Sequence, residues 1–140
     1  MEAGLAVPLI AFLSQLVTQK KCKVMKEIKA FIRTKKVNDV ALNLQKNNFC
    51  CFSIFEGDGS GNFSDPKKEY PSLKHPYLHY KIAKLEIVCD RENESAIVEI
   101  IKEHAYTGKS GDGLIYVSNV ESRVRIRTGK RKNGESSHSH

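Results

Sequence analysis

Three segments of this sequence carry residue types that could bind an anion. Segment 107–113 reads Thr-Gly-Lys-Ser-Gly-Asp-Gly, and its glycines would allow backbone N–H groups to approach a phosphate closely. Arg125 and Arg127 are separated by one residue, and two guanidinium groups can clamp a polyphosphate through paired hydrogen bonds. A second glycine-rich segment, 57–61, follows a predicted strand. Each pattern also occurs in plain connections or solvated strand edges, so none of them decides the function alone.

Neither glycine-rich segment fits a standard nucleotide-binding motif. A P-loop needs a glycine five residues before the one that precedes its lysine, and that position is Glu103. A P-loop also runs from a strand into a helix, whereas segment 107–113 leaves a predicted helix and enters a strand. Segment 57–61 opens no helix, which argues against a dinucleotide-binding fold. A phosphate-binding turn of backbone N–H groups is the interpretation that survives.

Other reactive side chains offer weaker alternatives. The four cysteines, Cys22, Cys50, Cys51 and Cys89, contain no C-x-x-C pair and indicate reduced thiols in a cytosolic protein. An alternative hypothesis is a metal-responsive or metal-binding trimer that uses Cys50, Cys51, His75 or His79 as soft ligands. No nucleophile–base pair and no paired catalytic carboxylates stand out at interpretable spacing, so we expect no enzyme.

Length and composition indicate one globular domain. The chain has 140 residues, of which 40% are hydrophobic and 28% charged. A formal net charge of +7 favours anionic partners. The apolar stretch 5–17 is shorter than the roughly 20 residues that span a bilayer, and it lacks the basic flank of a secretory signal. We therefore expect residues 1–24 to be an N-terminal extension of a cytoplasmic protein, which reaches a membrane only through its target.

The hydrophobic pattern predicts alternating strands and helices. Period-two alternation and apolar runs bounded by turn residues predict strands at 26–32, 49–56, 81–89 and 114–117. Apolar residues at helical spacing predict one helix from Val37 to the Asn47–Asn48 pair, and a second that is capped by Asp90 and ends before Gly108. The order β-α-β-β-α-β is the ferredoxin-like α+β arrangement, in which two helices cover one face of a four-stranded antiparallel sheet. The other face needs water or a partner.

The C-terminal part continues with a strand-like run. Between residues 120 and 129, Val124 and Ile126 alternate with three arginines, which predicts one more strand with the guanidinium groups along one edge. Residues 130–140 are polar, and we expect a disordered tail. An RNA-recognition module shares this element order but needs stacking aromatics on its central strands, where residues 84–86 read Lys-Leu-Glu. Nucleic acid is therefore not an expected partner.

Three motifs together resemble the PII signal-transduction family, the nitrogen-regulatory trimers. They are Lys-Leu-Glu-Ile-Val at 84–88, segment 107–113, and Arg-Ile-Arg-Thr-Gly at 125–129. The similarity runs without gaps from Met25 to Gly129, which would be the PII-like domain. The resemblance implies a homotrimer whose sheets pack into a central barrel, with an adenine nucleotide in the clefts between subunits. It also implies an effector-contacting arm, the T-loop, at about 57–80.

The resemblance also implies which residues contact the nucleotide. Segment 111–113 would hold phosphates and ribose from one subunit, while the two arginines would reach in from its neighbour. The full implied set is Gly59, Gly61, Glu86, Val88, Thr107, Gly111, Asp112, Gly113, Arg125 and Arg127. The implied ligand is ADP or ATP, with AMP as a further candidate.

Three departures from the family pattern narrow these expectations. Leu114 replaces a phosphate-binding lysine, so one charge opposite a triphosphate is missing. Phe63 replaces the glutamine that helps bind 2-oxoglutarate and magnesium. This replacement argues against 2-oxoglutarate sensing and leaves undecided whether magnesium binds. The uridylylated tyrosine motif is absent, and His75 falls near its place.

The arm itself suggests a target. Segment 70–78, Tyr-Pro-Ser-Leu-Lys-His-Pro-Tyr-Leu, is similar to a divergent PII-like subgroup whose members accompany membrane transporters, including heavy-metal efflux systems. The sequence therefore predicts a non-enzymatic regulator that controls a target protein, with a membrane transporter as the expected target, through its T-loop.

Overall fold

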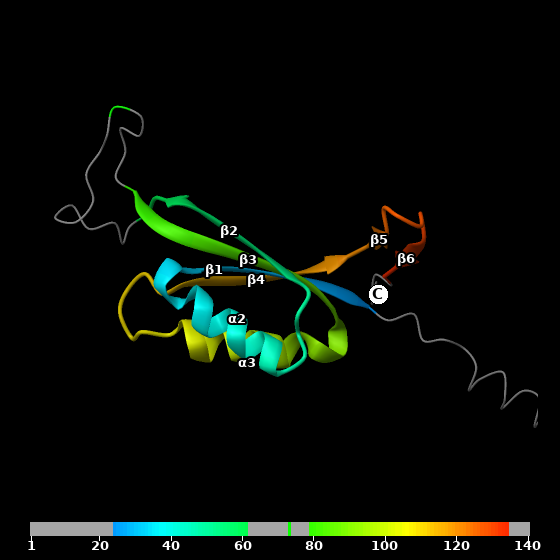
Figure 1. Cartoon of the computed structure of the whole chain (residues 1–140), viewed down its shortest axis with the longest axis horizontal. Coiled ribbons are helices and arrows are strands. Elements are labelled where there is room, and N and C mark those ends of the chain that lie inside the picture. The colour runs from blue at the N-terminus through cyan, green and yellow to red at the C-terminus, as the bar shows by residue number, and fades with distance from the viewer. Residues whose placement is uncertain (1–23, 62–72, 74–78, 135–140) are drawn as a thin grey trace, which may run out of the picture.

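The computed structural model describes residues 24–61, 73 and 79–134. Its main body is a four-stranded antiparallel sheet with two helices on one side (Figure 1). The strand order is β2-β3-β1-β4. The elements of this body are β1 (Met25–Arg33), η1 (Thr34–Lys36), α2 (Val37–Lys46), β2 (Phe52–Gly59), β3 (Tyr80–Asp90), η2 (Arg91–Asn93), α3 (Glu94–Ala105) and β4 (Gly113–Val120). This confirms the predicted ferredoxin-like α+β fold.

The core lies between the sheet and the helices. In β1, Ile28, Ala30 and Ile32 are buried, as the period-two pattern predicted. They face α2 and α3, because successive side chains of a strand point to opposite faces of the sheet. The helices and β3 complete the buried cluster with Val40, Leu44, Ala83, Leu85, Ile87, Ile97, Ile101 and Ala105.

The opposite face of the sheet is open and mixed in character. The register places Leu114, Phe31, Lys84 and Phe55 in one row across β4, β1, β3 and β2. The rings of Phe31 and Tyr116 meet edge to face, with centroids 5.9 Å apart. Leu114, Tyr116 and Phe55 are each more than half exposed. Large apolar side chains gathered on an uncovered sheet face are typical of a surface that binds a partner.

The four predicted strands have different boundaries from those expected, by one residue at each end for β1 and β3 and by up to three residues for β2 and β4. β2 begins at Phe52 and continues through Gly59, so most of the glycine-rich segment belongs to a strand. These glycines pair through their backbone, with Gly57 opposite Ile82 and Gly59 opposite Tyr80. β4 likewise extends to Val120 rather than ending at residue 117. Segments 62–72 and 74–78 of the expected T-loop lie outside the described residues.

The predicted helix cap at Asp90 is only partly right, because Asp90 is the N-cap residue of the short turn η2, whereas Asn93 is the N-cap residue of α3. Asp90 is the last residue of β3, paired with Met25, and makes no capping hydrogen bond with its side chain. The short turn η2 separates it from α3. Its carboxylate instead accepts a hydrogen bond from Lys132 Nζ at 3.0 Å. Pairing with β1 holds this residue in the sheet, and the helix therefore begins four residues later.

The single C-terminal strand expected across 120–129 is also wrong. Residues Ser122–Val124 form β5, and the chain then reverses and returns as β6 (Arg131–Asn133). The turn is closed by a hydrogen bond from Gly129 N to Arg125 O at 2.7 Å, and Gly129 has a positive φ of 66°. The sequence predicts a disordered tail over residues 130–140, but residues 131–133 of it form β6. These residues are ordered because they pair with β5 and because Lys132 donates a hydrogen bond to Asp90 of the main body. Residues 1–23 and 135–140 lie outside the described part of the chain.

Neither helix in the described part of the chain has the length and apolar character needed to cross a membrane.

The start of β4 depends on a glycine. A Cβ atom on Gly113 would lie 1.7 Å from the carbonyl oxygen of Phe31, and its φ of +115° is unfavourable for any other residue. We expect Gly113→Ala to lower the free energy of unfolding by about 2 kcal/mol or more, as measured by urea denaturation. Gly57→Ala in β2 is the control, because nothing lies within 4 Å of its added Cβ. Its expected effect is below about 1 kcal/mol. Equal midpoints for the two variants would contradict the close approach at Gly113.

Candidate functional site

The glycine-rich loop 107–112 is organised around the carboxylate of Asp112. Oδ2 of Asp112 accepts hydrogen bonds from the backbone N–H groups of Thr107 at 2.8 Å and Gly108 at 3.0 Å. Its Oδ1 accepts a hydrogen bond from the Thr107 hydroxyl. Gly108 and Gly111 both have positive φ, which only glycine adopts readily. The loop thus folds back on its own acidic residue.

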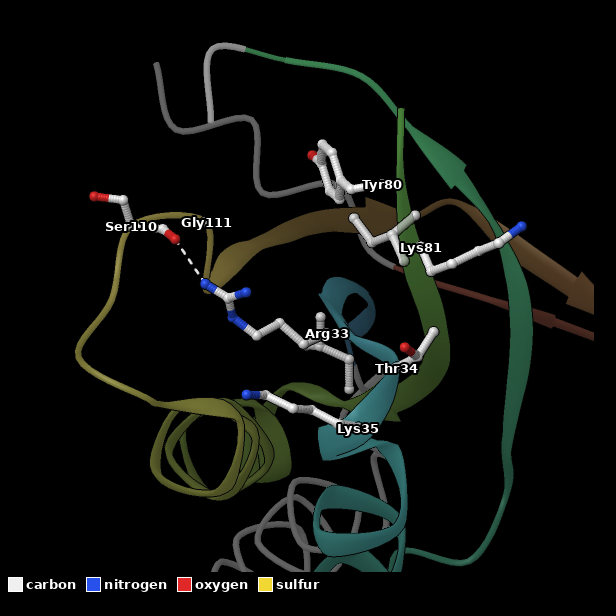
Figure 2. Close-up of a pocket in the computed structure, with 9 residues that line it drawn as sticks. Arg33, Thr34, Lys35, Tyr80, Lys81, Ser110 and Gly111 are labelled. Carbon is white, nitrogen blue, oxygen red and sulfur yellow. Dashed lines mark hydrogen bonds between the residues drawn. The ribbon is translucent and has the colours of Figure 1, made fainter. Parts of the chain in front are cut away.

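Arg33, at the end of β1, ties this loop to the sheet (Figure 2). Its Nε donates to Asp112 Oδ1 at 3.1 Å, and its Nη2 donates to the carbonyl oxygen of Ser110 at 2.6 Å. The hydrogen bonds from Thr107, together with the Arg33 guanidinium, hold the pKa of Asp112 well below its usual range. Asp112 therefore carries a full negative charge at neutral pH and pairs with a full positive one.

A cavity of about 270 Å³ lies beside this loop. Its walls include three cationic side chains, Arg33, Lys35 and Lys81, together with Tyr80 and Gly111. In Figure 2, Arg33 and Lys35 extend toward the glycine-rich loop from neighbouring positions. Arg33 is paired with Asp112, and Lys81 Nζ lies 2.7 Å from Asp58 Oδ1. A cavity with this lining can receive an anionic group.

Gly59 and Gly61 lie at the base of the expected T-loop, on the side of Tyr80. A Cβ on Gly59 would come within 3.0 Å of the Tyr80 ring, and one on Gly61 would lie 3.9 Å from its hydroxyl. Tyr80 also lines the cavity beside the loop. The Tyr80 side chain therefore lies beside the predicted residues Gly59 and Gly61 and lines the same cavity as Gly111.

Glu86 and Val88 lie on the open face of β3. Lys84 Nζ is 2.8 Å from Glu86 Oε1, and this hydrogen bond lowers the pKa of the Glu86 carboxyl group. Both predicted residues line a shallow cavity of about 460 Å³, which also includes Cys51, Ser53 and Arg123.

Arg125 and Arg127 project from the turn of the β5–β6 hairpin and are exposed. A concave surface of about 710 Å³ runs along this hairpin. Its cationic side chains are Arg123, Arg125, Arg127, Lys130, Arg131 and Lys132. Segment 122–133 contains no aspartate or glutamate, so this surface is strongly electropositive.

One chain does not bring the predicted residues together. The glycine-rich loop precedes β4 and the arginine hairpin follows it, so they lie at opposite ends of the sheet (Figure 1). Eight strand residues span roughly 25 Å. That distance exceeds the reach of an arginine side chain, so a ligand that contacts both elements needs two copies of the chain.

Sequence reasoning missed Arg33 and Lys35. Arg33 contacts Asp112 across 79 positions of the chain, and no local pattern marks such a contact. The sequence offers one signal for Arg33, which is that a basic residue stands at the end of the first predicted strand. The other outward-facing residues of that strand had no assigned role.

The metal-binding alternative gains no support. Within the described ranges, no three His, Cys, Asp or Glu side chains converge to hold a metal ion. His75, one of the suggested ligands, lies outside these ranges.

Comparison with known proteins places the chain in a family. Residues 25–130 match the family model "Nitrogen regulatory protein P-II". The chain belongs to the nitrogen regulatory protein P-II family. A P-II protein of Rhizobium meliloti (strain 1021) is 36% identical over 106 residues, which cover 76% of this chain and 95% of that protein. The P-II protein of Porphyra purpurea is 35% identical over 104 residues, covering 74% and 93%.

A third relative has a similar identity. Nitrogen regulatory protein P-II 1 of Methanothermobacter thermautotrophicus (strain ATCC 29096 / DSM 1053 / JCM 10044 / NBRC 100330 / Delta H) is 35% identical over 108 residues, or 77% of this chain and 94% of that protein. These matches confirm the resemblance drawn from the three motifs, and they place the chain among signal-transduction regulators of the P-II type.

The charge on Asp112 should make the loop sensitive to acid. Because its folded pKa is depressed, the carboxylate stabilises the fold above its unfolded pKa of about 4, and this contribution is lost as the pH falls below that value. We expect Asp112→Asn to lower the free energy of unfolding at pH 7 by about 1–2 kcal/mol, measured by urea denaturation. The deficit should shrink below pH 4.

Glu103→Gln, on the exposed surface of α3, is the matched control and should change stability by less than about 0.5 kcal/mol. A deficit for Asp112→Asn that stays constant from pH 7 to pH 3 would argue against an ionised Asp112 as the loop anchor.

Proposed function

We propose that this P-II protein is a non-enzymatic regulator that binds an adenine nucleotide in the clefts between three copies of the chain. ADP and ATP are the principal ligands proposed, with AMP as a third candidate. The loop 107–113 and Gly59 and Gly61 would come from one subunit. Arg125 and Arg127 would come from its neighbour, with Glu86 and Val88 beside the cleft.

The observation that carries this proposal is the separation of the two phosphate-binding elements by the length of β4. A glycine-rich loop can offer backbone N–H groups, and an arginine turn can offer bidentate donors. Each element alone is an exposed and weak anion site. Two copies arranged head to tail would place the loop of one against the hairpin of the other, which gives a heterologous interface that closes into a ring.

The open face of the sheet supports the same assembly. Leu114 is 62% exposed, Tyr116 54% and Phe55 53%. Burial of such side chains contributes about 25 cal/mol for each Å² of apolar surface removed from water. Sheets that pack together through this face would supply the free energy that holds the clefts in place.

The arm and its target complete the proposal. β2 and β3 lead into and out of the expected T-loop, and Tyr80 connects its base to the cavity beside loop 107–112. A nucleotide bound there would change which positions of the arm are favoured, and loop ordering of this kind is a common switching route. A membrane transporter is the proposed target, on the basis of the sequence of segment 70–78, which lies outside the described residues.

The test is calorimetric titration of the full chain with ATP, ADP and AMP. We expect saturable binding to the wild type, and at least about tenfold weaker binding to Arg125→Ala/Arg127→Ala, because each lost charge-assisted hydrogen bond costs about 1.5–3 kcal/mol. Lys46→Ala/Lys102→Ala removes the same charge from the exposed helical layer and should bind like the wild type.

Light scattering on the same samples should give three times the chain mass of 15.8 kDa for all three proteins. Negligible heats with all three nucleotides, or a monomeric wild type, would refute the proposal.

A further inference from the structure

Two adjacent thiols lie just before β2. Cys50 and Cys51 are free and exposed, and their Sγ atoms are 3.8 Å apart. The nucleotide-binding site proposed above uses neither of them. Adjacent exposed thiols at this separation can react with the same reagent.

These thiols border two cavities. Cys50 and Cys51 line a cavity of about 220 Å³ together with Cys89. Cys51 also lines the open-face cavity that contains Glu86 and Val88, two residues of the proposed nucleotide cleft. A chemical change at Cys51 would therefore alter a wall of that cleft.

The chemistry of adjacent cysteines favours a reversible change. Consecutive Cα atoms are about 3.8 Å apart, whereas most disulfides join Cα atoms about 4.4–6.8 Å apart. A disulfide between neighbours is therefore strained and easily reduced, as regulatory disulfides are. Partial burial raises the pKa of the Cys89 thiol, which makes that third sulfur a poor nucleophile.

We propose that Cys50 and Cys51 form a thiol-modification site that a low-molecular-weight disulfide converts into an intramolecular disulfide, thereby weakening nucleotide binding in the adjacent cleft. In the first step, one cysteine thiolate attacks a sulfur of the small disulfide and releases one thiol. In the second, the other thiolate attacks the protein sulfur of this mixed disulfide and releases the second thiol. Two protein thiols are oxidised and one small disulfide is reduced to two thiols.

The contact between the two sulfurs supports this order of events. A hydrogen bond with Cys50 raises the pKa of the Cys51 thiol, and a charge on one sulfur disfavours a charge on the other. The two thiolates therefore do not form together. The second can form once the first sulfur is bonded and uncharged.

The test is mass mapping of the full chain after incubation with glutathione disulfide. Iodoacetamide then blocks the remaining thiols before trypsin digestion. Cleavage after lysine and arginine places Cys50 and Cys51 together in peptide 47–67 and Cys89 in peptide 85–91. We expect peptide 47–67 to lose two hydrogens and carry neither alkyl group nor glutathione, while Cys89 is alkylated. Dithiothreitol should restore both thiols.

Variants separate the outcomes. Cys89→Ser should still form the disulfide. In Cys51→Ser, Cys50 should form no disulfide within the peptide, and should carry either glutathione or, if it has not reacted with glutathione disulfide, the alkyl group. Two separate adducts in peptide 47–67, two unreacted thiols in that peptide, or a disulfide from either cysteine to Cys89 would overturn the proposal.

The effect on the cleft rests on the proposed function, and a separate measurement tests it. Oxidised wild type should bind ADP more weakly than reduced wild type, and Cys50→Ser/Cys51→Ser should bind ADP equally in both conditions. If reduced wild type binds ADP and oxidation leaves that affinity unchanged, the link to the cleft is wrong. If reduced wild type binds no nucleotide, the proposed function fails, while the mapping result still decides whether the disulfide forms.

Discussion

The length of β4 is the constraint on which this interpretation depends. A strand of eight residues separates the glycine-rich loop from the arginine hairpin by roughly 25 Å, and hydrogen bonds to β1 along its whole length keep that separation fixed. No rearrangement of side chains within one chain can bring the two elements to one phosphate. Both elements can donate hydrogen bonds to an anion, the loop through backbone N–H groups other than the two that Asp112 accepts, and the hairpin through guanidinium groups. Two donor elements held apart in this way can contact one ligand only across an interface between copies.

The loop end of this arrangement is preorganised by a partly exposed network of an ion pair and backbone hydrogen-bond donors. Asp112 accepts hydrogen bonds from Thr107 and Gly108, and Arg33 joins the loop to the end of β1. The positive φ of Gly111 and the contact of Gly113 with Phe31 leave little freedom in the backbone that follows. A ligand that binds there would have little conformational entropy to remove from the loop, which favours affinity. The proposed P-II switch would then lie mainly in the arm rather than in the phosphate-binding loop.

Local patterns in the sequence predicted most of the fold. Ile28, Ala30 and Ile32 alternate with polar neighbours and are buried as expected, and the helical spacing of Val40 and Leu44 places both in the core. The C-terminal run misled the prediction because Val124 and Ile126 alternate with arginines just as a strand would. The structure turns there, and the Ile126 side chain is fully exposed. The hairpin forms because Gly129 allows the turn and because β5 pairs with β6. Neither cause can be recognised from the alternation of apolar and charged residues.

The candidate site was less accessible to such reasoning. The motifs at 84–88, 107–113 and 125–129 identified the family, which the comparisons confirmed. The contact of Arg33 with Asp112 joins residues 79 positions apart, so it becomes visible only once β1 and β4 lie side by side. The roles assigned to the ten implied nucleotide-binding residues stay predictions.

Mixed trimers test the shared cleft most directly. Arg125→Ala/Arg127→Ala removes the hairpin side, and Gly111→Glu places a carboxylate in the loop side, so each variant alone should bind ADP at least about tenfold more weakly than the wild type. Unfolding and refolding the two together in equal amounts should restore binding at about one quarter of the sites, because each side is then intact in half of the subunits. Calorimetry that finds no binding in the refolded mixture, although the wild type treated in the same way binds ADP, would contradict a cleft built from two subunits.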